Sequence, residues 1–109
     1  MGQAKEIIIR QHAFDELRES FHYYADNYSI EFAEKFRIKF YQQIETLLSD
    51  YDIFPECRFL LTKRKIYRNI TWGNYLIIYK IRTRSVEILS LFHTKRDPLK
   101  LKSLRRVKH

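Results

Sequence analysis

The chain has 109 residues, of which 45% are hydrophobic and 16% aromatic, a length that fits one compact domain and excludes separate catalytic and recognition domains. Its two glycines and single cysteine exclude a glycine-rich phosphate loop, an internal disulfide and a multi-cysteine zinc site. The net charge of +8 is unevenly divided: residues 1–57 carry 6 basic and 11 acidic residues, whereas residues 58–109 carry 15 basic and 2 acidic residues.

This segregation of charge indicates a polyanionic partner, either nucleic acid or an acidic protein, although a merely solvated cationic face would have the same composition. No apolar run reaches the about 18 residues that a membrane helix needs, and the first residues lack the apolar core of a signal peptide. We therefore predict a cytoplasmic protein without membrane contact, metal or cofactor. It should form a single domain over residues 1–109, with residues 99–109 as a basic tail.

The first half of the chain has the pattern of one strand followed by two helices. Three consecutive isoleucines predict a short strand over residues 5–10. Apolar residues three and four apart then form the faces of two helices, Ala13, Phe14, Leu17, Phe21, Tyr24 and Tyr28 in the first and Ala33, Phe36, Phe40, Ile44, Leu47 and Tyr51 in the second. On the first helix, Asp15, Glu16, Arg18 and Glu19 occupy the other side. Since Ser29 can cap the second helix after about two linking residues, we expect an antiparallel hairpin.

The second half of the chain changes to the period of strands. Residues 65–71 alternate, residues 75–81 form a nearly unbroken apolar run, and residues 86–92 form a further strand. The unbroken run is typical of a central strand that is covered on both faces. Gly73-Asn74 supplies a turn, and Asp97 can cap a short final helix through Leu99, Leu101 and Leu104.

These elements predict an α+β fold of order β-α-α-β-β-β with a short C-terminal helix. The helical hairpin should pack on one face of an antiparallel sheet of about four strands, with the first strand at its edge. We expect the opposite face to be shallow and to gather the basic residues of the second half on one exposed surface.

Four segments, taken in order, resemble the RelE/ParE superfamily of bacterial type II toxins. They are HAFDELRESFHYY, EFAEKFRIKFYQQIETLL, IYRNITWGNYLIIYKI and VEILSLFHTKRDP. The resemblance covers about residues 5 to 99. It implies a growth-arresting toxin that is neutralised by an acidic, partly disordered antitoxin. RelE-like members cleave mRNA on the ribosome without a metal, whereas ParE-like members poison DNA gyrase.

The nuclease set of the RelE-like members is incomplete in this chain. Metal-independent RNA cleavage needs a base, cations on the phosphate and an acid. The family's nuclease arginine would fall at Leu76, its lysine pair would fall near Tyr67 and Asn69, and no tyrosine follows Arg96. We therefore favour the ParE-like function. The ribonuclease remains an alternative, and a non-toxic nucleic-acid-binding domain or decayed toxin is a third.

If the chain is a nuclease, the candidate catalytic residues are His93, Arg68 and Arg96. His93 can exchange a proton near neutral pH, and an arginine fork matches phosphate oxygens. Two of them have a structural alternative: His93 can simply end its strand, and Arg68 can pair with a carboxylate such as Glu87.

Cations near the candidate site are predicted to contact the target or nucleic acid, and these are Lys63, Arg64, Lys65, Arg68, Lys95 and Arg96. A solvated loop is the alternative for the run 63–65. A flexible basic tail would add sequence-independent affinity for polyanions through Lys100, Lys102, Arg105, Arg106 and Lys108.

Overall fold

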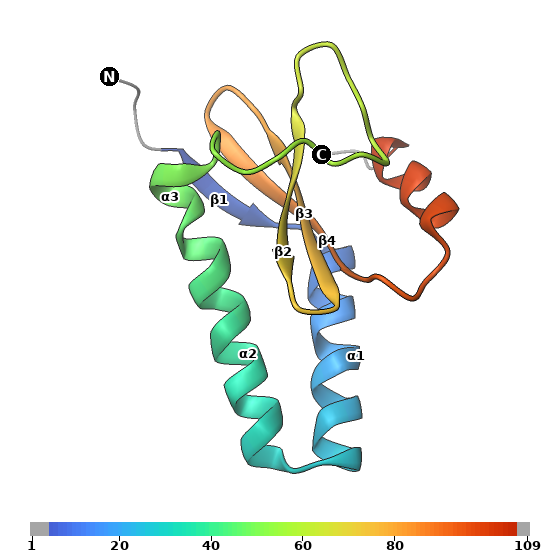
Figure 1. Ribbon diagram of the computed structural model, residues 1–109. Helices are drawn as coiled ribbons and strands as arrows, with labels where there is room; N and C mark the ends of the chain where they lie inside the picture. The colour runs from blue at the N-terminus through green and yellow to red at the C-terminus, as the bar shows by residue number, and fades with distance from the viewer. Residues whose placement is uncertain (1–4, 107–109) are drawn as a thin grey trace.

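The computed structural model describes residues 5–106, which form a sheet, a helical hairpin and a short C-terminal 3-10 helix (Figure 1). The elements in chain order are β1 (Glu6–Ile9), α1 (Gln11–Asn27), α2 (Ile30–Glu45), α3 (Leu47–Asp50), β2 (Tyr67–Trp72), β3 (Tyr75–Ile81), β4 (Ser85–His93) and η1 (Pro98–Arg106). The predicted α+β fold and its β-α-α-β-β-β order are confirmed. Within residues 5–106, no helix is both long and apolar enough to span a membrane.

The sheet has the strand order β1-β4-β3-β2. Strands β2, β3 and β4 form the predicted antiparallel meander, and β1 lies at the predicted edge. However, β1 pairs with β4 in parallel, so the sheet is mixed and not wholly antiparallel. The difference has a simple cause: a long connection separates β1 from β4, and a connection of that length allows a parallel pairing that a tight hairpin would forbid.

The two long helices form the predicted hairpin. The Ser29 hydroxyl accepts a hydrogen bond of 3.0 Å from the Phe32 backbone N–H and thereby caps α2. The predicted apolar face of the second helix is buried at Ala33, Phe36, Phe40, Ile44 and Leu47.

The predicted apolar face of the first helix is only partly buried. Ala13 and Leu17 lie in the core, but Phe14 is 40% exposed and Tyr28 is 65% exposed. The hairpin extends past the end of the sheet in Figure 1, so the sheet does not cover the residues near its tip.

The second face of the sheet carries an apolar core, and the prediction of a shallow basic face was wrong. Cys57 and Leu60, which precede β2, pack with Leu101 and Leu104 of η1 against strand residues that include Ile78. The strand residues Leu89 and Phe92 belong to the same cluster. Because both faces of β3 and β4 are covered, the unbroken apolar run of β3 is explained.

The C-terminal segment is a docked helix as far as residue 106. A 3-10 helix has three residues per turn, so Leu101 and Leu104 lie on one face and both are 3% exposed. Leu99 lies on another face and is 66% exposed, so only Leu101 and Leu104 of the predicted helix pack in the core. Lys108 and the side chain of Arg106 lie outside the described part of the chain.

Candidate binding site at the end of strand β4

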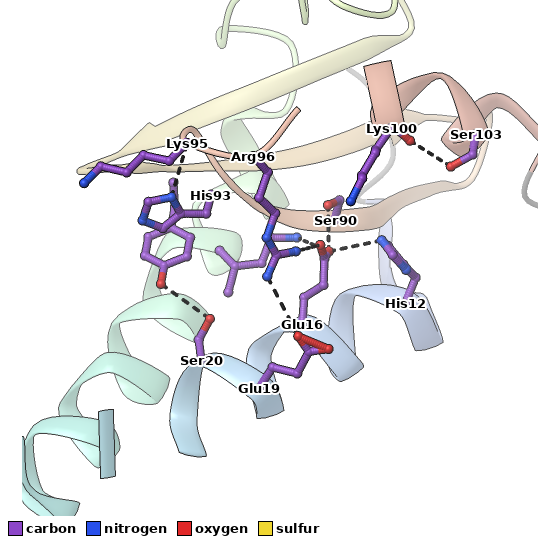
Figure 2. A network of polar contacts seen from close by, with 12 residues as sticks. His12, Glu16, Glu19, Ser20, Ser90, His93, Lys95, Arg96, Lys100 and Ser103 are labelled. Carbon is purple, nitrogen blue, oxygen red and sulfur yellow. Dashed lines mark hydrogen bonds and ion pairs between the residues drawn. The ribbon is translucent and has the colours of Figure 1, made fainter. Parts of the chain in front are cut away.

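A tight turn at the end of β4 places three of the predicted site residues at the rim of the sheet (Figure 2). His93 pairs with Tyr75 of β3 in the ladder. The Thr94 N–H donates to the Asn74 carbonyl at 2.8 Å, and the Arg96 N–H donates to the His93 carbonyl at 2.9 Å. These bonds fix the backbone that carries His93, Lys95 and Arg96.

Glu16 of α1 lies under this turn and is 5% exposed. One carboxylate oxygen, Oε1, accepts hydrogen bonds from the Ser90 hydroxyl at 2.6 Å and from the Leu91 N–H at 2.9 Å. The other, Oε2, lies 3.0 Å from Arg96 Nη1, and His12 Nε2 lies 3.3 Å from Oε1 (Figure 2). Glu16 thus joins the helical hairpin to β4 and to the turn. The sequence placed it on the polar side of the helix, which the structure corrects.

Burial raises the pKa of the Glu16 carboxyl, and this effect outweighs the opposing contributions of Ser90, His12, Leu91 and Arg96. Burial therefore disfavours the charged form of the Glu16 carboxyl, and its donors only partly offset this desolvation cost. Removal of Arg96 would leave the buried Glu16 carboxylate without its ion-pair partner on the turn.

Arg96 is occupied by this network. In addition to Glu16, its Nη2 lies 3.8 Å from the Glu19 carboxylate. The guanidinium remains 43% exposed, so part of it faces solvent. Its charge is nevertheless balanced by carboxylates of the first half of the chain, contrary to the expectation that the basic residues gather unpaired on one surface.

His93 is held by its neighbours but has no acid beside it among the described residues. Its Nδ1 accepts a hydrogen bond of 3.2 Å from the Lys95 N–H, and its ring meets the Tyr75 ring edge to face at 5.0 Å. Partial burial, together with the charges of Lys95 and Arg96, lowers the pKa of the His93 imidazole. The ring is therefore neutral at neutral pH.

A hollow of about 510 Å³ opens beside this turn. Its lining residues are Glu19, Ser20, Tyr23, Tyr24, Tyr75, His93, Lys95 and Arg96, and we call it the rim hollow. The Tyr24 and Tyr75 hydroxyls share a hydrogen bond of 3.0 Å across it. Burial and this bond raise the pKa of the Tyr24 phenol, so Tyr24 supplies no anion at neutral pH.

Aromatic side chains continue from the rim hollow to the tip of the hairpin. The Tyr24 ring stacks on Tyr28 at 5.7 Å and lies 5.1 Å from Phe32. Tyr23, Tyr28 and Phe32 are 56%, 65% and 47% exposed. The sequence placed Tyr24 and Tyr28 on one apolar helical face. Tyr24 does pack against the core, whereas Tyr28 is exposed at the end of the hairpin.

Arg68 lies at the opposite end of the sheet from His93. Its guanidinium donates to the carbonyls of Asp52, Phe54 and Lys65 at 2.9, 2.9 and 2.8 Å. It therefore ties the segment after α3 to β2 and makes no pair with Glu87.

The ladder register separates Arg68 from the turn at the end of β4. Trp72 is opposite Tyr75, which is opposite His93, and Arg68 lies four residues back along β2. Four residues and two strand spacings correspond to about 16 Å between α-carbons. The structure brings His93 and Arg96 together and does not bring Arg68 to them.

The position of the family's nuclease arginine lies in a groove of about 430 Å³ on the second face. Leu76 lines this groove beside Phe92, its partner in the ladder. Among the groove's lining residues the only cation is Arg58. The one carboxylate there, Glu56, accepts a bond from the Thr62 N–H. This groove therefore lacks the cations that would hold a scissile phosphate.

The remaining predicted contact residues, Lys63, Arg64 and Lys65, are exposed in the segment before β2 and away from the rim hollow. Trp72 is half-buried and stacks on Phe36 at 4.7 Å between ring centroids, so it packs on α2. Within residues 5–106, no three His, Cys, Asp or Glu side chains gather as metal ligands.

The raised pKa of Glu16 predicts a pH-dependent effect of Glu16→Gln. The folded state holds the Glu16 proton more tightly than the unfolded chain, so the contribution of Glu16 to stability is largest at low pH. It decreases from roughly pH 4 upward until the raised pKa is passed. The free energy of unfolding of the variant minus that of the wild type should therefore rise between about pH 4 and 7 in urea unfolding. A difference that is constant or falls with pH would contradict the raised pKa.

Comparison with known families and structures identifies the fold. The family model described as "ParE toxin of type II toxin-antitoxin system, parDE" matches residues 7–98. The chain is similar to the solved structure "Chromosomal ParDE TA system from P. aeruginosa", with a TM-score of 0.72 and 14% identity over 84% of this chain and 98% of that one. No relative matches among curated protein sequences. Because the family match spans most of the sequence, this chain belongs to the ParE toxin family of type II toxin–antitoxin systems.

Proposed function

We propose that the chain arrests growth by poisoning DNA gyrase in the cytoplasm and that a cognate antitoxin neutralises it. Family membership supports a toxin of this kind. The similar structure is described by its title as a ParDE toxin–antitoxin system, and we extend that kind of partner to this chain.

The separation of the candidate nuclease residues is the observation that favours DNA gyrase over mRNA as the target. Arg68 is bound to three backbone carbonyls at one end of the sheet, and Arg96 is paired with Glu16 at the other. Leu76 occupies the position of the family's nuclease arginine. A base, a phosphate-holding cation and an acid must lie within about 3 Å of the reacting atoms, and this arrangement does not supply them in one place.

The antitoxin would be an acidic segment that folds on binding. The groove on the second face of the sheet fits such a segment because Leu76, Phe92 and Phe59 offer apolar contacts and Arg58 offers a charge. Electrostatic attraction between the basic residues 58–109 of this chain and an acidic antitoxin segment would speed their association.

The target protein would contact the rim hollow and the hairpin tip. Tyrosine and arginine are the residues that most often dominate binding at protein interfaces, and contiguous exposed aromatic residues are typical of such surfaces. Tyr23 and Tyr28 supply the exposed rings. Lys95 supplies a charge that has no ion pair with any residue of the described part of the chain.

An assay with purified components distinguishes gyrase poisoning from mRNA cleavage. We expect the chain to accumulate linear DNA from supercoiled plasmid only when DNA gyrase is present. We expect no cuts in mRNA on translating ribosomes. His93→Ala should retain gyrase-dependent accumulation of linear DNA, because His93 lines the rim hollow but performs no proton transfer in this function. Ribosome-dependent cuts that disappear in His93→Ala would establish the ribonuclease instead, and growth without arrest on induced expression would establish a decayed toxin.

Charge reversal at Lys95 tests the target-binding surface. Lys95→Glu should raise the toxin concentration needed for half-maximal accumulation of linear DNA by about 10-fold or more, because it places a carboxylate in the rim hollow. Arg84→Glu in the turn between β3 and β4 makes the same change of charge at an exposed cation, at the end of β4 opposite His93, and is the matched control. Equal effects of the two substitutions, or a fall in melting temperature for Lys95→Glu alone, would contradict a role of this surface in target binding.

A further inference from the structure

Two segments far apart in the sequence meet beside the second core and carry exposed cations. The Arg105 guanidinium donates a hydrogen bond of 3.0 Å to the Leu61 carbonyl. Leu60 packs in the same cluster as Leu101 and Leu104 of η1. Figure 1 shows the segment between α3 and β2 reaching η1 before it rises into a loop and returns into the sheet. The positions of these two segments are thus fixed relative to each other.

The three-residue period of η1 aligns the cations on its outer side. Leu101 and Leu104 are buried, so Lys102 and Arg105, each one residue further along, share a neighbouring face. Arg105 contacts the Leu61 carbonyl, at the base of the loop that carries Lys63, Arg64 and Lys65. We call these five exposed residues the basic face: Lys63, Arg64, Lys65, Lys102 and Arg105.

None of the five cations of the basic face forms an ion pair with a carboxylate of the described residues, and the one carboxylate bonded to this loop, Glu56, accepts from the Thr62 backbone N–H. The sequence has no Asp or Glu between residues 58 and 86, and none after Asp97. Five arginines elsewhere are ion-paired with carboxylates: Arg10, Arg18, Arg37, Arg82 and Arg96. The like charges of the basic face repel one another without such compensation, and a bound polyanion would relieve that repulsion.

We propose that the basic face binds the phosphate backbone of duplex DNA without sequence preference. This binding is a property of the chain itself and goes beyond the proposed action on gyrase. It would hold the toxin on DNA independently of any protein target.

The chemistry of the surface favours DNA over a protein or a membrane. The cores of protein interfaces are depleted in charged residues, and lysine is depleted across them, whereas protein–DNA interfaces are polar and strongly positive. A helix that lies in a membrane surface must present its apolar face to the lipid. The apolar residues Leu101 and Leu104 of η1 are already buried against the sheet, and the exposed Leu61 and Leu99 stand singly.

The test measures how the full chain binds a fluorescently labelled DNA duplex of about 20 base pairs and arbitrary sequence. Fluorescence anisotropy reports the binding at salt concentrations from about 50 to 200 mM. About four or five phosphate contacts predict a slope of roughly −4 for the logarithm of the association constant against the logarithm of salt concentration. A second duplex of unrelated sequence should bind within about 3-fold of the first, because phosphate contacts carry no sequence information.

Paired substitutions locate the binding. Lys63→Gln with Lys102→Gln removes one charge from each segment and should weaken binding by about 10-fold or more at 100 mM salt, with a slope less negative by about 2. Lys35→Gln with Lys39→Gln removes the same charge from exposed positions on α2 and should change binding by less than about 3-fold. Equal melting temperatures of the two variants and the wild type show that folding is unaffected.

Three results would overturn the proposal. The first is the absence of duplex binding at about 50 mM salt, where phosphate contacts are strongest. The second is an equal loss of binding in the two paired variants, which would show that only net charge matters. The third is tighter binding of poly-glutamate, or of vesicles containing about 30% phosphatidylserine, than of the duplex. That result would assign the face to an acidic protein or to a membrane.

Discussion

The buried carboxylate of Glu16 is the contact on which the arrangement of this molecule depends. It is the point where the helical hairpin, strand β4 and the turn before η1 are joined, through Ser90, Leu91 and Arg96. Without it, α1 would rest on the sheet mainly through apolar contacts, which are not directional, and through the Tyr24–Tyr75 hydrogen bond further along the helix. The bond to Arg96 also sets where the rim hollow lies, because Arg96 is part of its lining. The same contact therefore orders the fold and shapes the candidate site.

Several arginines of residues 58–109 are bonded to carboxylates or carbonyls of the protein itself. Arg68 closes the segment after α3, Arg82 lies 3.5 Å from the Glu87 carboxylate, and Arg96 meets Glu16. These cations are committed to the protein's own carboxylates and carbonyls, and an arginine engaged in this way is poorly placed to hold a scissile phosphate. Lys95 and the five cations of the basic face, by contrast, form no ion pair with the described carboxylates. The net charge of +8 is compatible with RNA cleavage. The pairing of these arginines within the protein nevertheless disfavours that reaction.

The sequence was sufficient for the order of elements because helix and strand periods are local properties. Ser29, the second helical face and the unbroken run of β3 all behave as their patterns indicate. The unbroken run also implied a covered second face, but the covering residues Cys57 and Leu60 belong to no periodic pattern.

The candidate site was less predictable because its contacts join residues distant in sequence. Glu16 lies next to Leu17 at the margin of the apolar face, and only the position of Ser90 on β4 makes it a buried partner. Arg68 alternates like a surface strand residue, yet its partners are backbone carbonyls, which leave no trace in a sequence. His93 and Arg96 could be grouped because they are three residues apart, whereas the ladder register that separates Arg68 from them is a property of the folded sheet.

A double-mutant cycle on Glu16 and Arg96 tests the central claim that the cations near the site are engaged by the protein's own carboxylates. Urea unfolding of Glu16→Gln, Arg96→Gln and the double variant at neutral pH gives the coupling free energy of the pair. The account predicts about 1 to 2 kcal/mol, because one partner is buried and the other partly exposed. The exposed pair Asp15–Arg18 should give less than about 1 kcal/mol in the same cycle. A coupling at Glu16–Arg96 within about 0.5 kcal/mol of zero would show that Arg96 is free to bind a substrate and would contradict the account.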